Sequence, residues 1–404
     1  METDERDHRR LGKELDLFTF SDSVGPGLPL WTPRGTIFRN ELDRFVWEMR
    51  EKHGYERVTI PHITKKELYE KSGHWDKFAE DLFKITSREG REYALKPMNC
   101  PHHTQIFARR PHSYREMPQR YAETTMVYRD EQSGELGGLT RVLSITQDDS
   151  HVFCRTEQIR DEFFKIWDMV DTFYKTFGFT LRVRLSFRDP ATPEKYIGTP
   201  AIWDHAEGAL RDMAQERGAD YFEGPGEAAL YGPKLDFMAK NAAGREWQVA
   251  TIQLDMNMPE RFDLVCINEK GERERIVMIH SAITGSIERC TAILLEHFGG
   301  ALPTWLSPVQ AKVLPIGEGH IAFARETLAA LKAAGIRAEI DESGESLGKK
   351  VRDAKGEKVP YLLVIGEREV ADKTAALEGR TEKHGSLPVA DIVAKLSKEI
   401  KERT

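Results

Sequence analysis

Cysteine is scarce in this chain of 404 residues, and long apolar runs are absent. The four cysteines, Cys100, Cys154, Cys266 and Cys290, are too few and too widely spaced to form a disulfide framework. No apolar run approaches the roughly 20 residues that a membrane-spanning helix needs, and no apolar segment follows a basic start at the N-terminus. We therefore expect a cytoplasmic protein with no membrane partner.

Two common nucleotide-binding signatures are also missing. The sequence contains neither a GxxxxGK[ST] phosphate-binding loop nor a GxGxxG dinucleotide-binding turn. The net charge of −7 argues against a general nucleic-acid coat, although it leaves room for a local basic groove. Any nucleotide-binding site in this protein must therefore be built from a different motif.

Strand and helix patterns are segregated over the first three quarters of the chain. Helical spacing of apolar residues predicts helices over 35–54 and 156–177. Alternation over 120–131 and 139–153 predicts a long antiparallel hairpin, and further strands are expected over 55–61 and 246–256. The pattern changes from strand to helix near Gly285, whereas only short strands and turns are expected between Gly178 and Tyr231. This segregation predicts an α+β fold with helices layered on an antiparallel sheet.

Strand and helix patterns alternate along the chain beyond the linker ALPTWLSP, which covers 301–308. Strands are expected over 309–316, 336–340 and 361–366, and helices over 320–335, 347–354 and 392–402. Such alternation is typical of a small α/β domain with a largely parallel sheet. We expect one domain over residues 1–305 and a second over 306–404.

The polar segment TQDDSH, at 146–151, interrupts a strand-like run. Alternate side chains of a strand share one face, which would carry Arg141, Leu143, Ile145, Gln147, Asp149 and His151. An arginine, an amide, a carboxylate and an imidazole in one row suit the wall of a pocket. A half-exposed strand without a site explains the same row.

Three possible metal ligands lie at the ends of three separate strand-like segments: Cys100, His151 and His280. Together these side chains would form a zinc site with an open fourth position. Each residue taken alone is better explained as an ordinary structural residue, and His102 and His103 are rival ligands on the same segment as Cys100.

Two arginines are candidates for binding an anion. Arg129 shares a strand face with Glu131, so the arginine suits a phosphate and the carboxylate suits a base edge or a metal ion. A surface ion pair is the alternative for these two residues. Arg289 lies three residues beyond Ser286, in the first turns of a helix whose N-terminus favours an anion.

Nine segments, in this order, resemble class II aminoacyl-tRNA synthetases and, within that class, the threonyl branch. They are DHRRLGKELDLF, SGHWDKF, LKPMNCPHH, YRDEQSGELGGLTRV, TQDDSHVFC, YGPKLDF, WQVATIQLD, HSAITGSIER and PTWLSPVQ. They span nearly the whole chain, and MNCP together with TQDD distinguishes this branch from the related prolyl and seryl enzymes. The resemblance implies an antiparallel class II catalytic sheet flanked by helices, a small α/β anticodon-binding domain, and a homodimer interface at 35–61.

The resemblance also implies an activity: ATP-dependent formation of threonyl-adenylate from L-threonine and transfer to tRNA(Thr). The family's zinc-ligand positions, one ion per subunit, fall on Cys100, His151 and His280. The implied ATP contacts, with Mg²⁺, are Arg129, Glu131, Arg141, Gln253, Ser286 and Arg289. The implied substrate contacts are Gln147, Asp149, Tyr231, Lys234 and Gln248. The implied catalytic residues are Arg129, Arg289 and His74, with His74 near the terminal ribose of the tRNA.

Several positions depart from the family pattern. The sequence starts almost at the catalytic core, so we expect a form that lacks the family's N-terminal editing region and activates serine measurably. Thr125 stands where many relatives have glycine, and Leu143 and Ser144 where they often have Arg-Gly. In the tail, Ser343 replaces an expected arginine, and ALEGR at 376–380 stands where the family usually has V-R-x-R. Arg380 would therefore have to substitute for the missing anticodon-contacting arginines from a shifted loop. A paralogue that adenylates an amino acid for another acceptor and a non-catalytic tRNA-binding paralogue are the alternatives.

Overall fold

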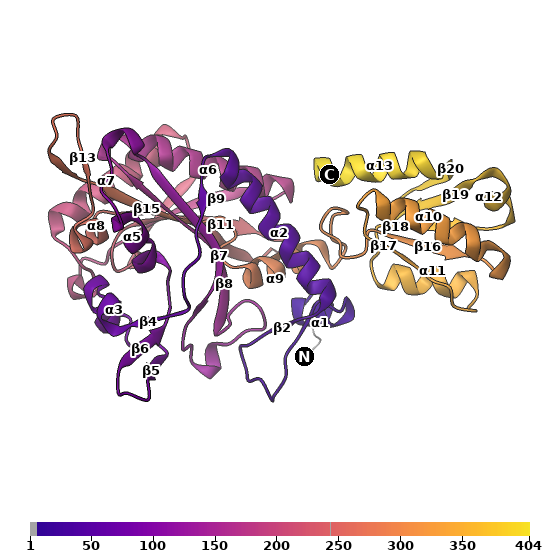
Figure 1. The fold of residues 1–404 in the computed structure, drawn as a ribbon, viewed down its shortest axis with the longest axis horizontal. Helices are drawn as coiled ribbons and strands as arrows, with labels where there is room; N and C mark the ends of the chain where they lie inside the picture. The colour runs from indigo at the N-terminus through magenta and orange to yellow at the C-terminus, as the bar shows by residue number, and fades with distance from the viewer. Residues whose placement is uncertain (1–5, 243) are drawn as a thin grey trace. The chain divides into compact units, whose positions relative to one another are not determined.

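The computed structural model describes residues 6–242 and 244–404. The chain forms two compact units (Figure 1). The larger unit contains Ser21–Pro29 and Asp43–Thr291, and the smaller unit contains Met1–Phe20, Leu30–Leu42 and Ala292–Thr404. The domain boundary expected at 305/306 stays a prediction.

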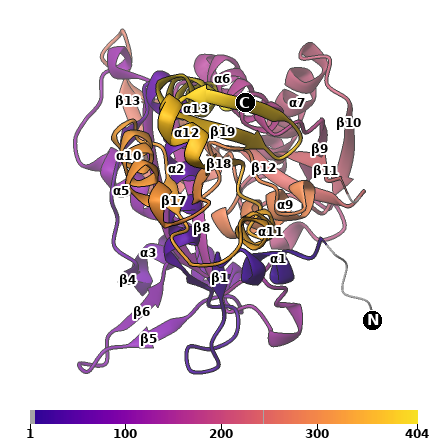
Figure 2. The same cartoon turned by 90° about the vertical axis from the view of Figure 1, so that its right-hand side faces the viewer.

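An eight-stranded sheet is the centre of the larger unit, in the order β10-β9-β11-β12-β15-β8-β7-β3. The strands are β3 Glu56–Arg57, β7 Gln119–Tyr128, β8 Ser144–Cys154, β9 Leu181–Phe187, β10 Tyr221–Pro225, β11 Lys234–Lys240, β12 Glu246–Asp255 and β15 Val277–Ala282. The six central strands pair antiparallel, and the edge strands β10 and β3 pair parallel with their neighbours. Figure 2 shows β10 at one edge. The antiparallel sheet predicted from the segregated patterns is confirmed.

Two expected helices are present, and each buries the apolar face that the sequence pattern assigned to it. Helix α6, Ile159–Thr176, packs on β12 and β15 and buries Phe163, Ile166, Val170 and Phe173 completely. Helix α2, Pro33–Lys52, buries Phe38, Leu42, Phe45, Val46 and Met49. The rings of Phe45 and Phe173 stack at 5.3 Å, which ties the second half of α2 to α6.

The expectation of only strands and turns between Gly178 and Tyr231 is wrong. Helix α7, Pro200–Glu216, occupies 17 residues of this segment. The Thr199 side chain caps its first turn, Pro200 stands at the first helical position, and Trp203, Ala206, Leu210 and Met213 form its buried face. That three- and four-residue spacing is the signal that the strand interpretation overlooked.

The second strand of the predicted hairpin is shorter than expected, because β8 begins at Ser144 and not at 139. Leu143 donates its backbone N–H to the carbonyl of Gly27, 2.8 Å away, so a separate loop takes the place of a neighbouring strand there. Arg141 and Leu143 therefore lie in the 129–143 connection. The row of six residues predicted for one strand face reduces to Ile145, Gln147, Asp149 and His151.

Smaller elements complete the larger unit. Its second sheet consists of β4 Ile63–Lys65, β6 Glu92–Leu95 and β5 Lys84–Thr86, and a two-stranded ribbon joins β13 Val265–Ile267 to β14 Arg273–Arg275. The short helices are α3 Lys66–Ser72, α4 His74–Lys77, α5 Cys100–Ala108 and α8 Asn257–Phe262. Helix α9, Ile287–Phe298, follows β15, and its residues from Ala292 on belong to the smaller unit. It confirms the change of pattern near Gly285.

The smaller unit contains a five-stranded sheet, in which β16 Ala311–Pro315, β17 Ala338–Ile340 and β18 Tyr361–Ile365 are parallel. The strands β19 Thr374–Gly379 and β20 Lys383–Pro388 add an antiparallel edge that the sequence interpretation did not include. Its helices are α10 Ile321–Ala333, α11 Leu347–Gly356, α12 Glu367–Asp372 and α13 Val389–Glu402, and its N-terminal part forms α1 His8–Glu14, β1 Phe18–Thr19 and β2 Leu30–Trp31. Across residues 6–242 and 244–404, no helix has the length and apolarity to cross a membrane.

Candidate active site

One row of polar residues crosses four strands of the large sheet. The strand register places His151 of β8 opposite His280 of β15, His280 opposite Gln253 of β12, and Gln253 opposite Lys234 of β11. Directly opposed residues of antiparallel strands point to the same face, so these four side chains form a line. Asp149 lies two residues from His151 on that face. The pocket interpretation of the polar segment at 146–151 therefore agrees with the register.

A cavity of about 220 Å³ opens over this row. Nine of the predicted site residues line it: Cys100, Arg129, Gln147, Asp149, His151, Tyr231, Lys234, Gln253 and His280. Six do not: His74, Glu131, Arg141, Gln248, Ser286 and Arg289.

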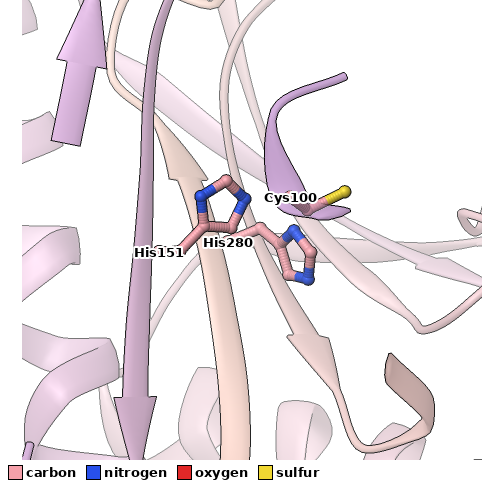
Figure 3. Close-up of side chains that lie close together, drawn as sticks. All are labelled: Cys100, His151 and His280. Atoms are coloured by element: carbon pink, nitrogen blue, oxygen red, sulfur yellow. The ribbon is translucent and has the colours of Figure 1, made fainter. Parts of the chain in front are cut away.

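Cys100, His151 and His280 come together inside this cavity from α5, β8 and β15 (Figure 3). One ligand atom from each lies within 4.8 Å of the other two, and all three residues are buried. Nitrogen and sulfur ligands of a tetrahedral zinc ion lie roughly 3.3 to 3.6 Å apart, so the three side chains would reach that spacing by a small inward movement and would leave a fourth position open. Burial raises the pKa of the Cys100 thiol, helped by Asp149 and Asp255, and a bound cation would favour the thiolate again.

The two histidines of this group each have a partner behind them. His280 Nε2 lies 2.9 Å from Asp255 Oδ2, and His151 Nδ1 lies 2.7 Å from His103 Nδ1. Burial lowers the pKa of His151, as do His280 and Arg50, so its ring is neutral. Nδ1 of His280 and Nε2 of His151 are therefore the nitrogens available to a metal ion.

The rival histidines on α5 do not belong to the group. His103 contacts His151 from behind through Nδ1, and burial lowers its pKa well below the usual range. His102 packs edge-on against Tyr69, and neither of its ring nitrogens has a hydrogen-bond partner in the described part of the chain. Neither histidine is among the residues that converge with Cys100.

Three arginines form a cationic cluster at the phosphate end of the predicted site. Arg129 lies over the ring of Phe78, and its buried Nε has no hydrogen-bond partner among the residues described. Burial lowers the pKa of Arg129, and burial together with Arg129 and Arg141 lowers that of Arg289. The positive charges of Arg129 and Arg141 thus act unfavourably on that of Arg289, and a bound anion would relieve this repulsion. Glu131 pairs with Arg141 at 2.8 Å, so the surface ion pair left open from the sequence exists, but with a different arginine.

His74 lies behind the cavity wall, completely buried. Its Nδ1 is 2.8 Å from the hydroxyl of Ser72, its Nε2 is 3.2 Å from Met98 Sδ, and its ring is 6.3 Å from that of Tyr231. Burial lowers the pKa of His74 to about 3, with His280 and Arg129 adding to the effect. The ring is therefore neutral at physiological pH.

Two other predicted site residues form hydrogen bonds to neighbouring residues outside the cavity. Gln248 donates to Asp236 Oδ1 at 2.8 Å and accepts from Arg184 at 2.9 Å. Ser286 Oγ accepts the backbone N–H of Arg289 at 3.1 Å and so caps the start of α9. Their roles in binding stay predictions.

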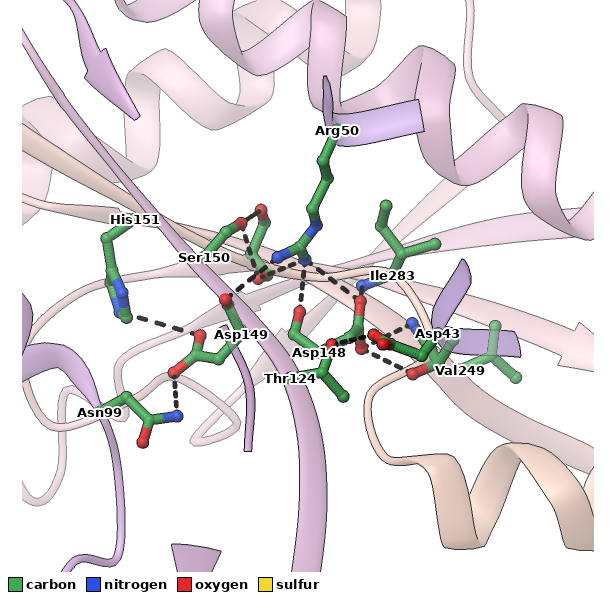
Figure 4. A network of polar contacts seen from close by, with 12 residues as sticks. Asp43, Arg50, Asn99, Thr124, Asp148, Asp149, Ser150, His151, Val249 and Ile283 are labelled. Carbon is green, nitrogen blue, oxygen red and sulfur yellow. Dashed lines mark hydrogen bonds and ion pairs between the residues drawn. The ribbon is translucent and has the colours of Figure 1, made fainter. Parts of the chain in front are cut away.

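The sequence interpretation missed the residues that hold the site from outside. Asn99 donates to Asp149 Oδ2 at 2.9 Å, and Arg50 donates to the backbone carbonyl of Asp149 at 3.0 Å (Figure 4). Asp255 accepts from the backbone N–H groups of Asn257 and Met258 in addition to His280. An aspartate between a strand and a helix, in QLDMNMP, was the one local signal for this group.

Two family models match the chain. Residues 83–298 match the class II tRNA synthetase core domain (G, H, P, S and T), and residues 310–399 match the anticodon binding domain. The threonine–tRNA ligase of Gloeobacter violaceus is 48% identical over 413 residues, which cover 100% of this chain and 66% of the relative. The RNA binding domain of threonyl-tRNA synthetase from Cryptosporidium parvum has a TM-score of 0.93 and 39% identity, over 97% of this chain and 98% of that one. The chain belongs to the threonyl-tRNA synthetase family.

Family membership explains the two-unit architecture, because the class II core match covers most of the large sheet and the anticodon-binding match covers the five-stranded sheet. Prolyl-tRNA synthetase from Cryptosporidium parvum shares this fold, with a TM-score of 0.75 at 16% identity. The chain spans 66% of the length of the curated threonine–tRNA ligase of Gloeobacter violaceus.

Proposed function

We propose that this chain forms threonyl-adenylate from ATP and L-threonine and transfers the threonyl group to tRNA(Thr). One observation carries the proposal. The Cys100/His151/His280 group and the guanidinium of Arg129, whose Nε has no partner in the described structure, line the same cavity. A site for an amine and a hydroxyl therefore faces the same space as a site for a phosphate.

One zinc ion per subunit, held by Cys100, His151 and His280, would supply a Lewis acid that accepts the amine and the hydroxyl of threonine. This chemistry selects threonine against valine, since a site built to bind a hydroxyl rejects the analogue that lacks it. The donor set supports the assignment, because one thiol and two neutral imidazoles suit zinc better than they suit magnesium or calcium.

The chain's own residues act mainly by positioning and by neutralising charge. Asp149, held by Asn99, faces the threonine amine, and Gln147, Lys234, Gln253 and Tyr231 line the rest of the cavity. Arg129 binds the α-phosphate, with Arg141 and Arg289 toward the outer phosphates. The threonine carboxylate oxygen attacks the α-phosphorus in line, and pyrophosphate leaves with Mg²⁺.

His74 is our candidate for assisting acyl transfer near the terminal ribose of the tRNA. Its ring is completely buried, with Nδ1 on the Ser72 hydroxyl and Nε2 beside Met98 Sδ, so we assign it the role of positioning the cavity wall at Tyr231. We also assign Gln248 to the outer part of the threonine site and Ser286 to the outer part of the ATP site. We also propose that the protein is a cytoplasmic homodimer, with 35–61 at the dimer interface.

One observation favours a second candidate, adenylation of threonine for an acceptor other than tRNA(Thr). Arg380, the arginine expected to contact the anticodon, donates instead to the backbone carbonyls of Lys358 and Leu302. Its guanidinium is thus engaged within the fold, and Ser343 offers no positive charge in its place.

Two assays separate these functions. Threonine-dependent exchange of labelled pyrophosphate into ATP tests adenylation, and charging of a tRNA(Thr) transcript tests transfer. We expect exchange and charging, with charging reduced when the anticodon is changed. Exchange without charging would support the second candidate, and no exchange with either threonine or serine would contradict both.

A further inference from the structure

His103 occupies a position that the proposed chemistry does not use. It is completely buried on α5, and its ring stands edge-on to that of His151, with ring centres 4.7 Å apart. The 2.7 Å separation of the two Nδ1 atoms is a hydrogen bond, and it is too short for two ligands of one tetrahedral zinc ion. His103 is therefore a partner of the ligand and not a ligand itself.

This hydrogen bond restricts where protons sit on both rings. A neutral imidazole carries one N–H, so one of the two facing nitrogens donates and the other accepts. A metal ion at Nε2 of His151 requires the lone pair of that nitrogen, which leaves the proton on Nδ1. His151 then donates to His103, and His103 carries its own proton on Nε2.

The other ligand histidine shows the contrast. His280 faces a carboxylate, Asp255, which only accepts and so fixes the proton on His280 Nε2 without ambiguity. His151 faces an imidazole, which accepts only in one of its two tautomers. Nε2 of His103 is buried and has no hydrogen-bond partner within residues 6–242 and 244–404, so no donor there requires this nitrogen to be the unprotonated one.

We infer that His103 is a positioning residue that holds His151 in the Nδ1–H tautomer and so presents His151 Nε2 to the metal ion beside Cys100 and His280. The inference rests on the zinc site of the proposed function. Its consequence is that the outer partner of His151 adds no charge, whereas the outer partner of His280 adds one negative charge. Outer partners of this kind orient the ring and tune the ligand.

Glutamine and methionine at position 103 provide a matched pair. The two side chains are similar in length and volume, but only glutamine offers an oxygen that accepts from His151 Nδ1–H. His102→Met is the control, since His102 is a buried neighbour on the same helix with no bond to His151. Zinc affinity is measured by competition with a chelator, ligand geometry by the visible absorption of the Co²⁺ form, and folding by thermal melting of the metal-free proteins.

We expect His103→Met to weaken zinc binding about 10- to 100-fold and to alter the Co²⁺ spectrum. His103→Gln and His102→Met should stay close to the wild type. Equal zinc affinity in the two position-103 variants would overturn the inference while leaving the zinc site intact. A wild-type protein that binds no zinc would overturn both.

A second measurement covers the case in which His103→Met fails to fold. Nitrogen-15 NMR of ring-labelled histidine in the zinc-loaded wild type reports the tautomers directly, and the spectrum of His103→Gln identifies the signals of position 103. We expect an Nε2–H tautomer for His103. An Nδ1–H tautomer there would overturn the inference, because His103 would then donate toward His151.

Discussion

Arg50 and Asp148 form an ion pair in the interior of the larger unit, with an Arg50 nitrogen 3.1 Å from Asp148 Oδ2. Their side chains are 2% and 0% exposed. Arg50 also donates to the backbone carbonyls of Asp148 and Asp149, and Asp148 accepts the backbone N–H groups of Ile283 and Thr284 (Figure 4). One buried pair thus ties α2 to β8 and to the turn that follows β15, behind the predicted substrate and metal residues.

Replacing Arg50 with methionine leaves the Asp148 carboxylate buried without its counter-charge. We expect the free energy of unfolding to fall by about 3 to 5 kcal/mol, as urea denaturation would measure. Lys52→Met is the control, because Lys52 is exposed on the same helix. A loss no larger than that of the control would show that water or rearrangement replaces the guanidinium.

The effect of Arg50→Met should depend on pH in a defined direction. Burial raises the pKa of Asp148 above its ordinary value, while Arg50 and the bonds from Thr284 oppose that rise. Without Arg50 the folded-state pKa rises further, so the folded protein retains a proton that the unfolded chain loses. The destabilisation should therefore be largest at neutral pH and shrink as the pH falls through the folded-state pKa of Asp148, which denaturation at several pH values would test.

Cys100→Ala should remove zinc from the purified protein. The loss of one of three protein ligands should reduce metal affinity by at least about 100-fold, more than the loss of an outer partner does. Threonine-dependent pyrophosphate exchange should fall with the metal content. Cys154→Ala is the matched control, since Cys154 is equally buried at the end of β8 but lies outside the ligand group. Full zinc content and exchange in Cys100→Ala would refute the metal assignment.

Arg129→Met should reduce kcat/KM for ATP in pyrophosphate exchange by about 10²- to 10³-fold, because the site loses a guanidinium aimed at developing charge. Zinc content should not change, since Arg129 is not a member of the ligand group. Arg88→Met removes an exposed arginine and serves as the control. An unchanged KM and kcat for ATP would show that the phosphates bind elsewhere.

The central elements were predictable because their signals are local. The alternation along β8 placed Gln147, Asp149 and His151 on one face, and the apolar spacing of α6 identified its buried side. Helix α7 was missed although its apolar spacing is equally local, because Trp203, Ala206, Leu210 and Met213 stand among charged residues and small side chains.

The supports of the site could not be predicted, because they depend on contacts far apart in the sequence. Arg50 and Asp148 are 98 residues apart, and His103 and His151 are 48 apart. No periodicity links such positions, and only the sheet register and the placement of α2 and α5 bring them together. The residue types alone suggested that Cys100 could converge with the two histidines, but only the family resemblance chose these three over His102 and His103.

Thr125→Val should destabilise the protein through Lys96. Lys96 is completely buried, and its amine donates to Thr125 Oγ1 at 3.0 Å. Loss of that acceptor leaves a buried ammonium poorly satisfied, which we expect to cost about 1 to 3 kcal/mol. Burial lowers the pKa of Lys96, so the folded protein loses this proton before the unfolded chain does, and the cost should diminish as the pH rises through the folded-state pKa. Urea denaturation at neutral and alkaline pH tests this, and an equal cost at both would contradict it.

Serine should be activated measurably by this 404-residue chain. A zinc ion that accepts an amine and a hydroxyl accepts both groups from serine as well, so only the contact with the threonine methyl group separates the two amino acids. One methyl group in a pocket is worth about 10- to 200-fold in kcat/KM, whereas valine, which lacks the hydroxyl, should be rejected by roughly 10⁴-fold or more. Pyrophosphate exchange with the three amino acids measures both ratios. A threonine preference over serine above about 10⁴ would exceed what a methyl contact supplies and would require a second discriminating contact within the cavity.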